Sequence, residues 1–282
     1  MRWINLGICL LIFSSEVVLA IDQITWGKYD YPPYYIHKGE LKGQGSEDQL
    51  VQLFQKHLKE YQHKNQNMPI ARFSLKAEAG EKFCMSGLYK TSEREKIFAV
   101  SIPTYIGPNE MIIIEKEKLG HLGHPKTIAF EELLQNQKLR GVFQKRSLGN
   151  VLGPILEKYQ HQPNVQVRSY KSKQVYGMLL LNRVDYTIDT IPTIIYLEKI
   201  SGKSNRMTSL EIQEVSQSHI YISVVCPKNA WGQRVITRIN EIIQSEKSTP
   251  QYRAIIEQWY DEHSRQQLRK VYDEVFMNWK SK

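Results

Sequence analysis

The segment LYKTSEREKIFAVSIP holds the arginine that is best placed for a chemical role in this chain of 282 residues. Arg94 follows an expected strand and loop, and its planar guanidinium can donate to both oxygens of a carboxylate. Gly87 and Thr91 could add backbone and hydroxyl donors beside it. The alternative is a solvated surface pair with Glu93 or Glu95, which would carry little energetic weight. On spacing alone, the surface pair is the favoured interpretation.

Sequence signs of catalysis or of a metal site are weak. The chain contains no G-x-S-x-G elbow, no H-E-x-x-H helix and no phosphate loop. His121 and His124 have a spacing that metal ligands can have, but Gly120 and Gly123 favour a mobile turn over a preorganised site. We therefore expect no enzymatic activity, no metal and no cofactor. An exported enzyme is the weaker alternative.

The N-terminal 20 residues are typical of a secretory signal peptide. Arg2 gives a short basic start, an apolar run covers residues 6–13, and residues 18–20 (VLA) form a small-residue cleavage site. The mature chain would begin near Ile21, and no later stretch is long and apolar enough to span a bilayer. Export of a soluble product is the expected outcome.

Cysteine usage agrees with export. Cys9 lies in the signal peptide, so only Cys84 and Cys226 remain in the mature chain. An oxidising compartment allows a disulfide between them, and two separate buried thiols are the alternative. The net charge of +9 is spread along the chain without an arginine-rich block or a nucleic-acid motif. A solvated basic surface is therefore expected, with no nucleic-acid partner.

Strands and helices are expected to alternate, which indicates an α/β fold. Expected strands cover residues 24–27, 72–77, 82–85, 111–114, 139–143, 165–167, 184–188 and 219–226, and expected helices cover 47–61, 127–135, 150–159, 172–181, 231–243 and 251–276. Between residues 29 and 35, the sequence YDYPPYY must form a loop because adjacent prolines lack ladder donors. No low-complexity linker divides the chain, so a second lobe would be joined by strands.

Four fragments in order resemble the bacterial extracellular solute-binding protein family 3, the type II periplasmic binding proteins that include polar amino-acid receptors. They are ITWGKYDYPPYYIHKGELKGQG, GLYKTSEREKIFAVSIPTY, LRGVFQKRSLGNVL and LLLNRVDYTIDTIP. Asn182 replaces the family's usual glycine in the last fragment, and the CMSGLYKTSERE form is similar to a divergent subgroup. The resemblance covers nearly the whole mature chain.

The resemblance implies a two-lobed type II periplasmic binding protein fold with a ligand cleft between the lobes and two crossover strands. Lobe 1 would combine residues 21–111 and 217–282, and lobe 2 would cover residues 112–216. The crossings would fall near residues 111–114 and 216–222. Cys84 and Cys226 would then lie on neighbouring strands of lobe 1, where a disulfide is credible. The location would be the periplasm.

The resemblance also assigns the ligand site. It gives Arg94 the role of holding a ligand carboxylate and makes this role the better interpretation. The full expected set of ligand-binding residues is Tyr31, Tyr34, Gly87, Leu88, Arg94, Arg146, Ser147 and Thr190. Arg146 and Ser147 precede a helix whose N-terminus favours an anionic group. Tyr31 and Tyr34 would stack on or cover the ligand, unless they pack on their own lobe.

The amine half of an amino-acid site is less well matched. Asp30 lies near the family's first acidic position, and Asp189 falls one residue before the second, where Thr190 stands. Asp185 is expected to be structural. The resemblance therefore favours carboxylate recognition over amino-acid recognition.

The expected function is a monomeric periplasmic receptor that delivers a small polar, carboxylated solute to an ABC-type transporter. A receptor that serves a membrane signalling protein is a near alternative, because the fold does not specify the downstream partner. A structural or surface-interaction protein is a third class, consistent with the basic charge.

Overall fold

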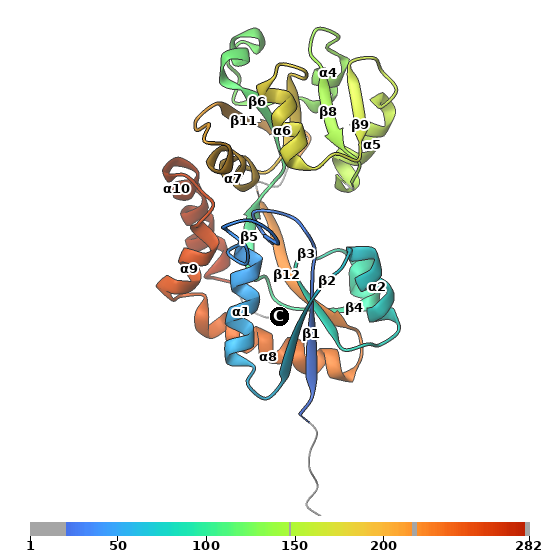
Figure 1. Ribbon diagram of the computed structural model, residues 1–282, viewed down its shortest axis with the longest axis vertical. Helices are drawn as coiled ribbons and strands as arrows, with labels where there is room; N and C mark the ends of the chain where they lie inside the picture. The colour runs from blue at the N-terminus through green and yellow to red at the C-terminus, as the bar shows by residue number, and fades with distance from the viewer. Residues whose placement is uncertain (1–20, 147, 216–218, 280–282) are drawn as a thin grey trace, which may run out of the picture.

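The computed structural model describes residues 21–146, 148–215 and 219–279 and shows two α/β lobes, one above the other (Figure 1). The predicted signal peptide lies outside the described residues. Lobe 1 is built on a sheet of order β2-β1-β3-β12-β4, in which β5 also pairs with β12. Lobe 2 is built on a sheet of order β7-β11-β6-β10-β8-β9. Among the described residues, no helix has both the length and the apolar character needed to cross a membrane.

The strands of lobe 1 are β1 (Gln23–Lys28), β2 (Gln62–Asn67), β3 (Phe83–Tyr89), β4 (Phe98–Val100), β5 (Tyr105–Pro108) and β12 (His219–Pro227). Its helices are α1 (Ser46–His57), α2 (Ile70–Glu78), α3 (Ser92–Ile97), α8 (Ala230–Glu246), α9 (Pro250–Glu257) and α10 (Glu262–Val271), followed by a π-helical turn at Tyr272–Phe276. The predicted helical face of α1 is confirmed, because Leu50, Val51 and Phe54 are fully buried.

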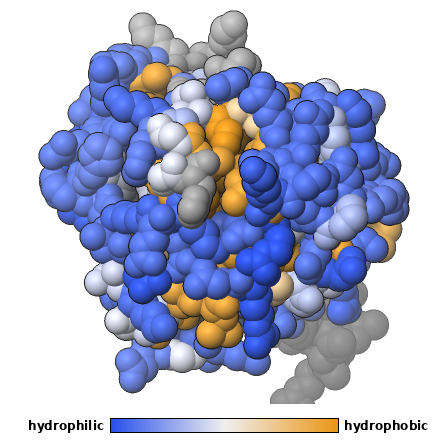
Figure 2. Space-filling view, turned by 90° about the horizontal axis from the view of Figure 1, so that it is seen from above, coloured by the Kyte–Doolittle hydropathy of each residue, from blue (hydrophilic) through white to orange (hydrophobic). Residues whose placement is uncertain are grey.

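The strands of lobe 2 are β6 (Met111–Glu115), β7 (Thr127–Ile128), β8 (Gly141–Gln144), β9 (Val165–Arg168), β10 (Tyr186–Asp189) and β11 (Met207–Ile212). Its helices are α4 (Phe130–Gln135), α5 (Gly149–Tyr159), α6 (Ser172–Leu180) and α7 (Ile191–Ser201), with a 3-10 helix at Lys116–Leu122. Seen from the lobe 2 end, the surface is mostly hydrophilic, with hydrophobic residues in patches between hydrophilic ones (Figure 2).

The chain passes between the lobes at the junction of β5 and β6. β5 pairs with β12 in the lobe 1 sheet, and β6, which begins three residues after β5 ends, pairs with β10 and β11 in the lobe 2 sheet. The return runs between β11 and β12 and includes residues 216–218, which lie outside the described residues. The lobe boundaries given above stay a prediction.

A hydrophobic cluster also joins the lobes beside this junction. Ile36 and Trp259 from lobe 1 are buried together with Tyr196 and Leu197 of α7 in lobe 2. The Trp259 and Tyr196 rings meet edge to face, with centroids 5.4 Å apart. Figure 1 shows α9 and α10 rising along the junction toward α7. The lobes therefore contact each other through packed side chains as well as through the crossing strands.

Three predicted elements are wrong. Residues 72–77 form part of α2 instead of a strand, because Phe73 and Ala77, four residues apart, are the buried positions and Leu75 is exposed. The strand in this region is β2, whose sequence QHKNQN has no apolar pattern because it is an edge strand paired only with β1. The predicted helix 127–135 begins only at Phe130, since Thr127 and Ile128 pair with β11.

The third error concerns the C-terminus. The predicted helix 251–276 is interrupted at Asp261, whose carboxylate accepts from the backbone N–H of Ser264 and begins α10 as a new helix. Sequence patterns also missed β11 and α7. β11 lies between polar, weakly patterned residues, and α7 is apolar on most of its surface, so it lacks the one-sided period that marks an amphipathic helix.

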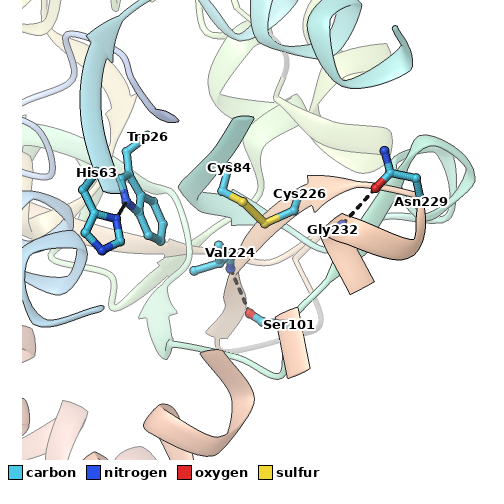
Figure 3. The surroundings of a disulfide bond; sticks show 8 residues. All are labelled: Trp26, His63, Cys84, Ser101, Val224, Cys226, Asn229 and Gly232. Atoms are coloured by element: carbon cyan, nitrogen blue, oxygen red, sulfur yellow. Dashed lines mark hydrogen bonds between the residues drawn. A yellow bond between two sulfur atoms is a disulfide. The ribbon is translucent and has the colours of Figure 1, made fainter. Parts of the chain in front are cut away.

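Cys84 and Cys226 form a disulfide between β3 and β12, which are adjacent antiparallel strands (Figure 3). Their Cα atoms lie 4.3 Å apart, and both residues are fully buried. Directly after the neighbouring strand β4, the hydroxyl of Ser101 accepts from the backbone N–H of Val224 at 2.9 Å (Figure 3). The disulfide thus joins a segment before the crossing to one after the return, and fixes both in the lobe 1 core.

Candidate ligand-binding cleft

The main cavity of the described structure is a cleft of about 1730 Å³ at the lobe junction. Lobe 1 contributes the loop after β1, the end of β3 and the start of α3, and lobe 2 contributes the loop between β8 and α5. Of the predicted site residues, those that line the cleft are Tyr31, Tyr34, Gly87, Leu88, Arg94 and Arg146. Ser147 lies outside the described residues.

Arg94 is held at the rim of the cleft by the structure of α3. The hydroxyl of Thr91 accepts from the backbone N–H of Arg94 at 3.2 Å and caps the helix. Nη1 of Arg94 donates to the Tyr89 carbonyl at 2.7 Å, and burial lowers the Arg94 pKa. Within the described chain, no salt bridge joins Arg94 to Glu93 or Glu95. Arg94 therefore lines the cleft without a salt bridge to these neighbours, and its role toward a ligand stays a prediction.

Gly87 and Leu88 are positioned by the bend at the end of β3. Gly87 has a φ of +89°, a left-handed conformation that favours glycine, and its carbonyl accepts from the Tyr29 hydroxyl at 3.3 Å. The Leu88 side chain is buried in a hydrophobic cluster, so its contribution to a ligand would come from the backbone. Tyr89, which the sequence reasoning did not select as a side chain, is 40% exposed and lines the cleft.

The loop after β1 presents a stack of tyrosines to the cleft. The Tyr31 ring lies between Tyr29 and Tyr34, with centroid distances of 5.8 and 5.2 Å. Asp48 fixes the loop, because its carboxylate accepts from the backbone N–H of Ile36 at 2.8 Å. Tyr31 and Tyr34 therefore pack on their own lobe and also border the cleft, and their contact with a ligand stays a prediction.

Thr190 connects the lobes and is not part of the described cleft lining. It precedes α7 and is buried, and its hydroxyl hydrogen-bonds the Tyr34 hydroxyl at 3.0 Å and that of Thr193 at 2.9 Å. Asp189, the acidic residue before it, accepts from Ser172 at 2.8 Å and is also buried. Asp30 pairs with Lys171 at 2.6 Å across the lobes. Each of these groups already has protein partners.

Arg146 places a charged and incompletely paired guanidinium in the cleft from lobe 2. Nη1 pairs with the carboxylate of Glu110 at the crossing, whereas Nε and Nη2 are buried and have no hydrogen-bond partner among the described residues. Burial lowers the pKa of the Arg146 guanidinium, but nearby negative charge, mainly that of Glu110, raises this pKa by more. The net shift is upward, so the group stays ionised. Nε and Nη2 form one edge of the guanidinium, and this edge can hold two carboxylate oxygens.

Asp185 is structural, as its sequence position indicated. Its carboxylate pairs with Lys118 at 2.6 Å and with Arg140 at 3.1 Å, away from the cleft. Sequence reasoning missed Glu47, Tyr105 and Glu110, which all line the cleft. Glu47 was assigned only to the start of a helix. The only sequence signal for a role of Glu47 in the cleft was that it follows Gly45 by two residues.

Several solved structures share the two-lobed architecture of this protein. It is similar to an amino acid ABC transporter substrate-binding protein from Streptococcus pneumoniae bound to L-arginine, at 17% identity and a TM-score of 0.60, over 85% of this chain and 94% of that one. It is also similar to an ancestral cationic amino acid solute-binding protein, at 15% identity and a TM-score of 0.64, over 86% and 96%. The fold is that of a two-lobed periplasmic binding protein.

A histidine kinase sensor domain with similarity to periplasmic binding proteins matches at 13% identity and a TM-score of 0.62, over 84% of this chain and 95% of that domain. Among curated proteins, none matches this chain in sequence. The family model of bacterial extracellular solute-binding proteins, family 3, matches residues 24–262. This chain belongs to that family.

Proposed function

We propose that this protein is a periplasmic receptor that binds a small polar, carboxylated solute and delivers it to an ABC-type transporter. The observation that carries the proposal is the buried Nε and Nη2 edge of Arg146 in the cleft, which has no hydrogen-bond partner among the described residues. Arg94 lines the same cleft from lobe 1. A carboxylate that contacts both lobes would favour their closed arrangement, because only that arrangement offers both arginines.

The test compares three arginine variants. Arg146→Lys keeps a positive charge beside Glu110 but removes the planar fork, and Arg94→Lys does the same in lobe 1. Loss of a charge-assisted contact predicts roughly a 10- to 100-fold weaker affinity for each. Arg140→Lys is the matched control, because Arg140 pairs with Asp185 outside the cleft.

Binding is measured by calorimetry with a solute that native mass spectrometry identifies in protein purified without refolding. If both cleft variants bind this solute as tightly as the Arg140→Lys control, the carboxylate site is excluded. Chemical conversion of the solute by purified protein would contradict a receptor without catalysis.

A receptor for a membrane signalling protein is the second candidate, supported by the likeness to a histidine kinase sensor domain. The two candidates share the cleft and differ in the membrane partner. Capture of solubilised membrane proteins on the ligand-bound receptor separates them. Recovery of a kinase or chemoreceptor alone would exclude the transport role.

A further inference from the structure

Glu110 is a largely buried acidic residue in the crossing between the lobes. Together with Asn109, it fills the link between β5, which ends at Pro108, and β6, which begins at Met111. Its side chain is 14% exposed and lines the cleft. A carboxylate withdrawn from water needs a charged or hydrogen-bonding partner. The partner of Glu110 therefore indicates its role.

The register of the lobe 2 sheet brings Glu110 close to Arg146. Met111, at the start of β6, pairs with Asp189 at the end of β10. β8 is the parallel neighbour of β10 and ends at Gln144. The start of β6 and the end of β8 therefore lie at the same edge of the sheet. Residues 110 and 146 extend from this edge and meet although they are 36 positions apart in the chain.

In the described parts of the chain, Glu110 and Arg146 have only each other as side-chain hydrogen-bond partners. Nη1 of Arg146 donates to the Glu110 carboxylate, and Nε and Nη2 have no described partner. Asp189 is the other carboxylate that interacts electrostatically with Arg146. It accepts instead from Ser172, Gln144 and a backbone N–H. The described contacts thus hold the guanidinium at a single nitrogen, from the crossing.

Two arginines outside the cleft are held differently. Arg269 donates from both Nε and Nη2 to Glu257, at 2.6–3.0 Å. Arg140 donates from the same two nitrogens to Asp185, at 3.1 and 3.3 Å. These pairs occupy the Nε and Nη2 edge, which is the edge that matches a carboxylate. The pair with Glu110 leaves this edge available.

Stability alone gives little reason for a charged pair at this place. A buried ion pair contributes little net stability, because desolvation of the two charges offsets most of their attraction. Alignment gives a better reason. An arginine side chain has many rotamers, and one that is already fixed removes an ordering cost from ligand binding. Arg94 in lobe 1 is anchored in a comparable way, since its Nη1 donates to the Tyr89 carbonyl at 2.7 Å.

We infer that Glu110 is a positioning residue, which holds Arg146 at Nη1 so that the Nε and Nη2 edge is aligned for a ligand carboxylate before the ligand binds. This inference rests on the proposed function and names the residue that aligns its arginine. Glu110 acts through Arg146 and does not itself contact the carboxylate. Without this anchor, binding would have to order the arginine side chain, and affinity would be lower.

Two substitutions at residue 110 separate alignment from charge. Glu110→Gln and Glu110→Met both remove the negative charge and keep the length of the side chain, but only glutamine retains an oxygen that can accept from Nη1. A difference in affinity between the two variants therefore measures alignment. We expect the methionine variant to bind a carboxylate roughly 2- to 10-fold more weakly than the glutamine variant, because the arginine is then ordered only on binding.

The probes are L-glutamine, L-arginine and malate, which are small polar carboxylates, and any solute released from the purified protein. Affinities are measured by calorimetry. In the Arg146→Lys background, the difference between the two variants should fall below about twofold, because a lysine ammonium has no planar edge to align.

Glu115 provides the matched control. It lies at the other end of β6, is 2% exposed and pairs with Arg206 at 2.9 Å, outside the cleft. Glu115→Gln and Glu115→Met break a buried ion pair in the same way as the two substitutions at Glu110. They should bind the probes with equal affinity.

The order of the Arg146 side chain is a second readout that needs no ligand. Nitrogen relaxation of the Arg146 Nε–H group, assigned by its loss in Arg146→Lys, should show a rigid side chain in the ligand-free wild type. The group should be mobile in Glu110→Met and rigid again in Glu110→Gln. A general loss of stability would not produce this local difference. If Glu110→Met does not fold, the ligand-free wild type decides, and a mobile Nε–H group overturns the inference.

Other outcomes also overturn the inference. Equal affinity of the Glu110→Gln and Glu110→Met variants would do so, as would a rigid Arg146 side chain in Glu110→Met. In those cases, loss of binding in Arg146→Lys still supports the proposed carboxylate receptor. If the wild type binds none of the probes and releases no solute, the proposed function fails, and the inference fails with it.

Discussion

Loss of the hydrogen bond between the Tyr34 and Thr190 hydroxyls should shift the equilibrium between joined and separated lobes toward the separated state. Tyr34 belongs to the lobe 1 loop and Thr190 precedes α7 in lobe 2, and the two oxygens are 3.0 Å apart. Burial raises the Tyr34 pKa well above its usual range, so the phenol stays protonated at all relevant pH values. Tyr34→Phe removes this inter-lobe contact and keeps the ring that borders the cleft.

The magnitude follows from what remains after the substitution. Thr190 keeps its hydrogen bond to Thr193 at 2.9 Å, so no buried hydroxyl is left unsatisfied. The cost is then the net value of one hydrogen bond, about 0.5–1.5 kcal/mol, which is roughly a two- to tenfold shift from joined toward separated lobes. The exposed pair of Asp30 and Lys171 also spans the lobes, but such pairs contribute only about 0–1 kcal/mol.

Energy transfer between dyes on the two lobes measures this shift. Leu75 in lobe 1 and Leu181 in lobe 2 are 67% and 64% exposed, so cysteines at these positions can be labelled. The native cysteines do not compete, because they are bonded to each other. Tyr34→Phe should enlarge the separated population, and Asp30→Asn should enlarge it less.

A double-mutant cycle completes the test. Thr190→Val removes the partner hydroxyl, and the coupling energy with Tyr34→Phe should match the single hydrogen bond. A population shift below twofold for Tyr34→Phe, or a larger shift for Asp30→Asn, would refute the idea that this contact holds the lobes together.

Two further predictions concern stability. Replacing Cys84 and Cys226 by serine should lower the free energy of unfolding by about 4–5 kcal/mol in urea titrations, since the bond closes a loop with a sequence separation of 142; a loss below about 1 kcal/mol would contradict the loop-entropy argument. Burial raises the Asp185 pKa, but Arg140 and Lys118 lower it to a net value of about 2, so its stabilising effect is present above pH 4 and lost toward pH 2. The Asp185→Asn variant should therefore melt at a lower temperature than the wild type at pH 5, and its melting temperature should fall less on acidification. If the melting temperatures of both proteins fall by the same amount from pH 5 to 2, this stabilising role of Asp185 is excluded.

Local patterns predicted the elements whose sequence carries a one-sided or alternating apolar period. The α1 face was predicted because its apolar residues Leu50, Val51 and Phe54 recur at helical spacing, and all three are buried. The edge strand β2 could not be predicted, because its side chains are polar and show no apolar alternation. Its strand conformation depends on backbone hydrogen bonds to the neighbouring strand β1, which the local sequence does not reveal. The α2 helix was mistaken for a strand because Phe73 and Leu75 alternate, and only packing decides that Leu75 faces solvent.

The sequence by itself determined the family-like order of motifs, the cysteine pair Cys84 and Cys226, and Arg94 and Arg146 as candidate carboxylate-binding groups. Tertiary structure decided which donors are free, because hydrogen bonding depends on neighbours that are distant in sequence. It joined Arg146 to Glu110 and left Nε and Nη2 without a hydrogen-bond partner in the described part of the chain. It also buried Glu47 beside Gly87, 40 residues later in the chain, where no salt bridge joins Glu47 to another described residue. A carboxyl group is ordinary in a sequence, and only the tertiary structure shows that this one is fully buried.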